Sequence, residues 1–212
     1  MVHTDTKTRI LDAAEKLFAR QGFDATSLRM LTREAGVNLA SVNYHFGSKE
    51  ELIKAVIARR ILPLNAIRIE RLQKIKNIAR AEGCPPDTRE ILLAFLEPTF
   101  AFRKSARGAQ DFISLIGRAF SDPRDTVRKV FMKMVEPVFQ PLFELLCEAL
   151  PSLPRNVVYL RLNFMLGAMA HSMNISQMCQ LIPDGLSLKV DSNTLVEQFV
   201  VFVENGMEAP YE

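Results

Sequence analysis

The sequence has no tryptophan, only three cysteines, and no apolar run long enough to cross a membrane as a helix. Cys84, Cys147 and Cys179 are far apart and odd in number, so they fit neither a zinc pattern nor a disulfide framework. They indicate thiols in a reducing compartment. The N-terminal segment lacks the apolar core and the cleavage site of a secretory signal. These absences together predict a cytoplasmic protein without a membrane span.

The residues of catalytic and metal sites are also scarce. The chain has three histidines, His3, His45 and His171. No Ser-His-Asp, paired-carboxylate or Cys-His constellation is recognisable in the sequence. We therefore expect no enzymatic activity, no bound metal and no cofactor.

The charge that is present is unevenly distributed. Residues 1–80 hold 15 Lys and Arg against 8 Asp and Glu, a net charge of +7, whereas the remaining 132 residues carry a net charge of −4. A basic N-terminal part joined to an acidic, apolar C-terminal part predicts an anionic partner at one end of the molecule only.

Apolar residues recur at helical spacing along the whole chain, and no segment alternates long enough to compete as a strand. The fold class is therefore all-α. A chain of 212 residues is long enough to bury a hydrophobic core. The first helix is expected to begin near Thr4–Asp5 and to end at Gly22. Further helices are expected near 27–35, 39–45, 48–80, 88–104, 107–120, 123–149, 155–178 and 192–207, with Pro63 kinking or breaking the long one.

The segment "GVNLASVNYHFGSKEEL", residues 36–52, has the caps of two short helices and the start of a long one. Gly36 suits the left-handed turn that ends a helix, and Asn38 suits the cap that begins the next. Ser48 and Glu51 form the pattern of a capping box for the long helix. Two short helices joined by a tight glycine turn are typical of a helix-turn-helix.

The short helix 39–45 has the size and chemistry to read DNA. A helix about 10–12 Å across fits the major groove, which is about 12 Å wide. Leu39, Val42 and Phe46 share the side that we expect to face the core. Ala40, Ser41, Asn43 and Tyr44 lie on the other sides, where Ala40 suits a thymine methyl; Lys49 suits a phosphate. His45 is either a surface or capping histidine or a phosphate contact.

Residues 8–53, "TRILDAAEKLFARQGFDATSLRMLTREAGVNLASVNYHFGSKEELI", resemble the DNA-binding domain of the TetR family of bacterial transcriptional regulators. The resemblance implies a homodimer on a palindromic operator in double-stranded DNA, with nine or ten helices per subunit. It implies a helix-turn-helix domain in residues 1–53 and a helical effector-binding and dimerisation domain in residues 54–212. By the same resemblance Leu39, Ala40, Ser41 and Asn43 face bases, and Thr26, Ser27, Tyr44, His45 and Lys49 contact the DNA backbone.

The C-terminal part is rich in Phe, Leu, Met and Ile, which can leave an adaptable apolar cavity between helices. The segments "GVNLASVNYHFGSKEEL", "EPVFQPLFELLCEALPSLP" and "FMLGAMAHSM" are similar to a fatty-acid-responsive, PsrA-type branch of the family. This resemblance implies a small hydrophobic effector such as a fatty acid or acyl-CoA. A ligand-independent or an activating DNA-binding regulator is the alternative. The residues predicted to hold the effector are Phe100, Phe112, Ile116, Phe139, Phe164 and His171.

A basic stretch follows the motif along the long helix. We interpret this stretch as a solvated helix face in preference to an additional DNA-binding surface. The residues concerned are Arg59, Arg60, Arg68, Arg71, Lys74, Lys76 and Arg80.

Overall fold

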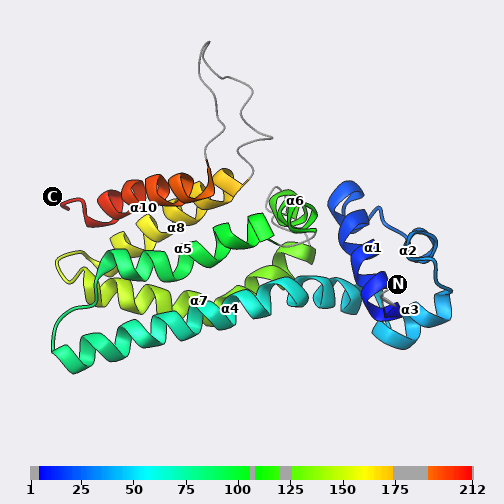
Figure 1. Ribbon diagram of the computed structural model, residues 1–212, viewed down its shortest axis with the longest axis horizontal. Helices are drawn as coiled ribbons and strands as arrows, with labels where there is room; N and C mark the ends of the chain where they lie inside the picture. The colour runs from blue at the N-terminus through cyan, green and yellow to red at the C-terminus, as the bar shows by residue number, and fades with distance from the viewer. Residues whose placement is uncertain (1–4, 106–107, 120–125, 174–190, 212) are drawn as a thin grey trace, which may run out of the picture. The chain divides into compact units, whose positions relative to one another are not determined.

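A computed structural model describes residues 5–105, 108–119, 126–173 and 191–211 of the chain (Figure 1). These residues form nine α-helices and no strand, which confirms the all-α prediction. The helices are α1 Thr6–Gln21, α2 Leu28–Ala35, α3 Leu39–Phe46, α4 Lys49–Glu82, α5 Thr88–Ser105, α6 Ala109–Ala119, α7 Thr126–Ala149, α8 Arg155–Met173 and α10 Ser192–Glu208.

The observed bounds agree with the predicted ones to within a few residues wherever the chain is described. The predicted helical residues 107, 120, 123–125 and 174–178 lie outside the described ranges. Pro63 does not break α4, which is one helix on both sides of it. Residues 83–87 form the link between α4 and α5.

The chain divides into two compact units. The N-terminal unit comprises residues 1–63 and 106–135, and the C-terminal unit comprises residues 64–105 and 136–212. The N-terminal unit thus holds α6 and the first part of α7 in addition to the helix-turn-helix. The functional division at residue 53 stays a prediction.

In the N-terminal unit, α1 packs against α2, α3 and α6. Ile10 and Phe18 on α1 are fully buried, as is Leu31 on α2. Arg9 donates from Nη2 to the carbonyl oxygens of Ala35 and Gly36, 2.7 Å away in each case, and so ties the end of α2 to α1. The packing of α1 therefore fixes where α2 ends and the turn begins.

A buried carboxylate joins α1 to α4 within the same unit. Glu15 is 2% exposed and accepts hydrogen bonds from Arg59 and, at 3.0 Å from Nε to Oε1, from Arg60. Arg59 also donates to Asp12 at 2.6 Å. The prediction of a solvated basic face is therefore wrong for Arg59 and Arg60, because a buried acid on α1 draws both inward. It is also wrong for Arg68, which is buried.

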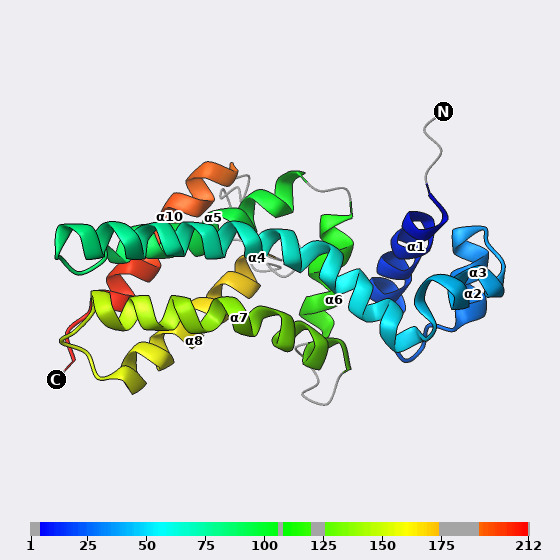
Figure 2. The ribbon, with the colours of Figure 1, turned by 90° about the horizontal axis from the view of Figure 1, so that it is seen from below.

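In the C-terminal unit, α10 packs along α5 and α8 (Figure 2). Arg89 at the start of α5 forms ion pairs with Glu197 and Glu204 of α10, at 2.6 and 2.5 Å. Arg161 on α8 donates to the carbonyl oxygens of Met207 and Ala209 at the end of α10. Within the described ranges, no helix is long and apolar enough to cross a membrane.

Candidate nucleic-acid interface

The turn between α2 and α3 is built from a glycine and an asparagine. Gly36 has φ +62° and ψ +40°, a left-handed conformation that favours glycine, and a Cβ there would lie 2.8 Å from Arg9 Nη2. Asn38 then caps α3, since its Oδ1 accepts from the Ser41 amide at 2.8 Å and from the Ser41 hydroxyl at 2.9 Å. The predicted glycine turn and asparagine cap are both confirmed.

Fewer residues of α3 face the core than predicted. Val42 is 2% exposed and Phe46 is 9% exposed, so both belong to the core. Leu39 is 46% exposed, and its predicted place in the core is wrong. Helical side chains lean toward the N-terminus of their helix, so a side chain in the first position of α3 projects past its end. Leu39 thus extends the outer surface, in agreement with its other predicted role, a base contact.

The outer side of α3 carries small and hydrogen-bonding side chains. Ala40, Asn43 and Tyr44 are exposed, and Tyr44 is 86% exposed, as the sequence predicted. Ser41 is half-buried, and its hydroxyl donates to Asn38 Oδ1, which leaves the Ser41 oxygen available as an acceptor. His45 is half-buried and meets the edge of the Tyr44 ring, with 5.2 Å between the ring centroids.

The residues predicted to contact the DNA backbone have different environments. Ser27 is exposed; its Oγ caps α2 by accepting from the Met30 amide, and its hydroxyl proton can still be donated to a phosphate. Thr26 is 1% exposed and donates its hydroxyl to the Gly22 carbonyl oxygen at 2.8 Å. In this conformation the Thr26 side chain positions the turn before α2 and does not reach the surface.

Lys49 stands at the start of α4, half-buried against the link between α1 and α2. Its Nζ donates to the Asp24 carbonyl oxygen at 3.3 Å and lies 4.4 Å from the centroid of the Phe23 ring. An ammonium has three N–H donors, so Lys49 can hold that link and bind a phosphate at once. Ser48 caps α4 by accepting from the Glu51 amide at 3.1 Å. The reciprocal half of the predicted capping box is not formed, because the Glu51 carboxylate pairs with Lys54.

Two exposed arginines on α2 were missed by the sequence reasoning. Arg29 and Arg33 form no ion pair within the described ranges, and both are on the helix that precedes the turn. The positive charge of residues 1–80 is the signal that could have found them. Their guanidinium groups add phosphate-binding capacity beside Ser27.

The six predicted effector residues do not gather in one unit. Phe112 and Ile116 on α6 belong to the N-terminal unit; the other four belong to the C-terminal unit. Phe100 and Phe112 are buried, and Ile116 and Phe139 are half-buried. Phe164 is 65% exposed and His171 is exposed.

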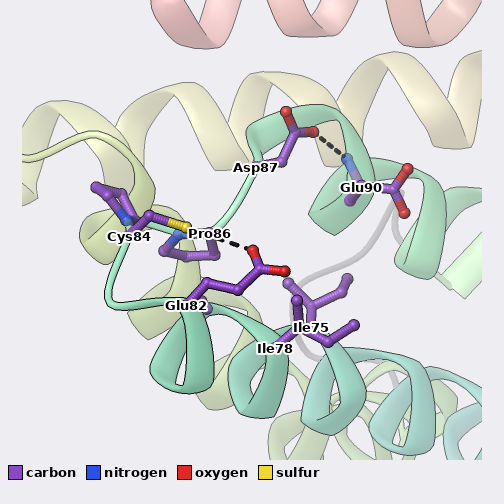
Figure 3. A pocket seen from close by; sticks show the side chains of 9 residues that line it. Ile75, Ile78, Glu82, Cys84, Pro86, Asp87 and Glu90 are labelled. Atoms are coloured by element: carbon purple, nitrogen blue, oxygen red, sulfur yellow. Dashed lines mark hydrogen bonds between the residues drawn. The ribbon is translucent and has the colours of Figure 1, made fainter.

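A cavity of about 220 Å³ lies at the link between α4 and α5, and none of the six predicted effector residues lines it (Figure 3). Ile75 and Ile78 form part of its apolar wall. Carboxylates of Glu82, Asp87 and Glu90 stand at the same cavity. Asp87 is engaged as the cap of α5, since its Oδ1 accepts from the Glu90 amide at 2.8 Å.

The fold and this interface define the class: a helix-turn-helix protein whose two short helices precede a long helix and a helical C-terminal region. Residues 10–56 match the family described as bacterial regulatory proteins, tetR family. Residues 93–206, more than half of the chain, match the family described as tetracyclin repressor-like, C-terminal domain. The chain belongs to the TetR family.

Individual relatives agree with this assignment. The regulator SrpR of Pseudomonas putida is 42% identical over 60 residues, a segment that spans 28% of this chain and 28% of SrpR. Among solved structures, FadR of Bacillus subtilis in complex with stearoyl-CoA gives a TM-score of 0.68 at 14% identity, covering 93% of this chain and 97% of FadR. NalD of Pseudomonas aeruginosa gives a TM-score of 0.65 at 20% identity, covering 98% of this chain and 97% of NalD. At these identities the structural likeness shows the fold alone.

Proposed function

We propose that the chain is a sequence-specific DNA-binding transcriptional repressor that a small hydrophobic effector releases from its operator. The observation that carries the proposal is the outer side of α3, where exposed Ala40, Asn43 and Tyr44 stand opposite the buried Val42 and Phe46. A helix anchored on one side and polar on the other is the shape and chemistry that the major groove accepts. Acting on chromosomal DNA, such a regulator works in the cytoplasm.

The contacts divide into two kinds. Leu39, Ala40, Ser41 and Asn43 face base edges in this proposal, since they lie within the first five positions of α3, the recognition helix of the helix-turn-helix. Ser27, Tyr44, His45 and Lys49 bind phosphates, which positions the protein without reading sequence. Thr26 contributes by holding the turn before α2, through its hydrogen bond to Gly22.

A homodimer is part of the proposal, because α8 and α10 expose apolar side chains in the single chain. Leu160 and Phe164, one turn apart on α8, are 51% and 65% exposed, and Phe202 on α10 is 69% exposed. A Cβ added to Gly167 or Gly206 would meet nothing within 4 Å, which leaves room for a close partner. A second copy covering this surface would bring two recognition helices to a palindromic operator, about 34–36 Å apart.

The effector is proposed to be a long-chain acyl compound, a fatty acid or an acyl-CoA. Support comes from FadR of Bacillus subtilis, which was solved with stearoyl-CoA and shares this fold. Buried Phe100 and half-buried Phe139 offer apolar contacts in the C-terminal unit. The effector shifts the equilibrium only by its different affinity for the DNA-bound and released conformations.

Selection from a random pool of duplex DNA tests the proposal directly. We expect the full chain to enrich a palindromic sequence, and long-chain acyl compounds to lower its affinity for that sequence about 5- to 150-fold, the range of ordinary allosteric coupling. Enrichment of no sequence would refute the DNA-binding proposal. Enrichment without release by any acyl compound would refute the effector proposal and leave DNA recognition standing.

A further inference from the structure

The buried polar side chains of the C-terminal unit concentrate around one arginine of α4. Arg68 is 3% exposed, and Asn65 and Thr99 beside it are 5% and 7% exposed. Arg68 donates from Nε to the Phe95 carbonyl oxygen at 3.2 Å and from Nη1 to Asn65 Oδ1 at 3.3 Å. Its Nη2 donates to Thr99 Oγ1. Its Cζ lies 4.1 Å from the centroid of the Phe95 ring.

The charge of Arg68 has no counter-ion among the described residues. All three of its acceptors are neutral, and no carboxylate pairs with it in the described part of the chain. Burial lowers the pKa of the Arg68 guanidinium to about 10, so the group still carries its charge at neutral pH. By contrast, Arg71 one turn later pairs with Glu97 at 2.8 Å on the surface. A buried cation without an anion is destabilising, and pairing it with an anion recovers that loss.

The guanidinium also has donors to spare. It carries five N–H groups, and three of them make the hydrogen bonds described above. The remaining two, one on each terminal nitrogen, have no acceptor among the described residues. A guanidinium fork of this kind binds the two oxygens of a carboxylate or phosphate side by side. Charge and donor geometry therefore call for the same partner, an oxyanion.

We propose that Arg68 binds the anionic head group of the effector, an oxyanion carried on an apolar body, through its two remaining N–H groups. This inference rests on the proposed function and specifies the chemistry of its ligand. The oxyanion takes the two N–H groups that Arg68 does not use, beside the hydrogen bonds that connect α4 with Phe95 and Thr99 of α5. Its binding therefore acts at the contact between these two helices. Because α4 is one helix from Lys49 to Glu82, a change at Arg68 acts on the element that begins beside α3.

A purely structural role for Arg68 predicts different behaviour. If Arg68 served only to clamp α4 to α5, its replacement by an apolar side chain of similar length would destabilise the ligand-free protein. If Arg68 is instead an unneutralised charge held for a ligand, Arg68→Met removes a buried charge, and the free protein melts at or above the wild-type temperature. Ligand-free stability therefore separates the two roles.

The experiment uses the full chain as wild type, Arg68→Met and the matched control Arg71→Met. Thermal unfolding is followed with increasing decanoate, decyl phosphate or 1-decanol, which share one apolar tail, at concentrations below micelle formation. We expect decanoate or decyl phosphate to raise the melting temperature of the wild type and of Arg71→Met. The apparent affinity of Arg68→Met for these anionic probes should fall at least tenfold. The response to 1-decanol should be the same in all three proteins. A response to decanoate identifies a carboxylate ligand, and a response to decyl phosphate alone identifies a phosphate.

Several outcomes would overturn the inference. They are an unchanged affinity of Arg68→Met for the anionic probes, a response of the wild type to 1-decanol equal to its response to those probes, or no response of the wild type to any probe. An Arg68→Met variant that melts below the wild type would favour the structural role, and Arg68→Lys provides a second test of binding. It keeps the charge but loses the fork, so it should bind the oxyanion more weakly than wild type; equal binding contradicts the proposal. Selected DNA released by a different compound would refute this inference alone. Oxyanion binding at Arg68 without any selected DNA would refute the proposed regulator and leave the site standing.

Discussion

At the scale of single residues, Asn43 is the side chain best placed to read a base. It is exposed on α3, and its amide can both donate and accept, as an adenine edge requires. We expect Asn43→Ala to relax discrimination at one base pair by about 1–3 kcal/mol while affinity for random DNA stays the same. Competition binding with operator variants at a fixed salt concentration measures the effect. An unchanged preference at every position would exclude Asn43 from base recognition.

Lys49 should act differently, because a phosphate contact carries no sequence information. We expect Lys49→Ala to weaken binding to specific and random DNA alike, and to lower the slope of log affinity against log salt concentration by about one unit. Lys54→Ala is the matched control, since Lys54 is on the same helix but engaged with Glu51. A loss confined to the specific sequence would contradict the phosphate assignment.

At the scale of elements, the cap of α3 gives a stability prediction. Asn38 Oδ1 accepts from the backbone amide and the hydroxyl of Ser41, so Asn38→Ala leaves the Ser41 amide without its acceptor. We expect a loss of about 0.5–2 kcal/mol in the free energy of unfolding. Urea denaturation measures it, with Asn43→Ala as the control from the same helix. Equal stability of the two variants would show that the cap contributes nothing.

The elements themselves were predictable because their signals are local. Apolar periodicity placed the helices, and Gly36, Asn38 and Ser48 marked ends that the structure confirms. Burial was harder to predict, because it depends on which elements meet in space. Thr26 is buried and Leu39 is exposed, and apolar spacing alone predicted neither. Likewise, Glu15 on α1 and its partners on α4 are more than forty residues apart, so their ion pairs were not visible in the sequence.

At the scale of the whole molecule, the prediction concerns assembly. Phe202 on α10 is 69% exposed, and an aspartate in its place would put a charge into the proposed subunit interface. We expect Phe202→Asp to shift sedimentation from dimer to monomer at micromolar concentration and to weaken operator binding. Ile69→Asp, at an exposed apolar position on α4, is the control and should remain dimeric. A wild-type chain that sediments as a monomer would refute the dimer itself.

The packing of α6 on α1 has a consequence for anyone who recombines such regulators. A chimaera that joins residues 1–53 to a foreign sensor would separate α1 from α6, two helices that pack together in the N-terminal unit. It would also lose Arg59 and Arg60, and Glu15 would be left buried without its cations. The transplantable piece is therefore discontinuous in sequence: residues 1–63 together with 106–135. Donor and recipient should be exchanged at all three junctions, after residues 63, 105 and 135, so that the helix-turn-helix keeps the helices of its own unit.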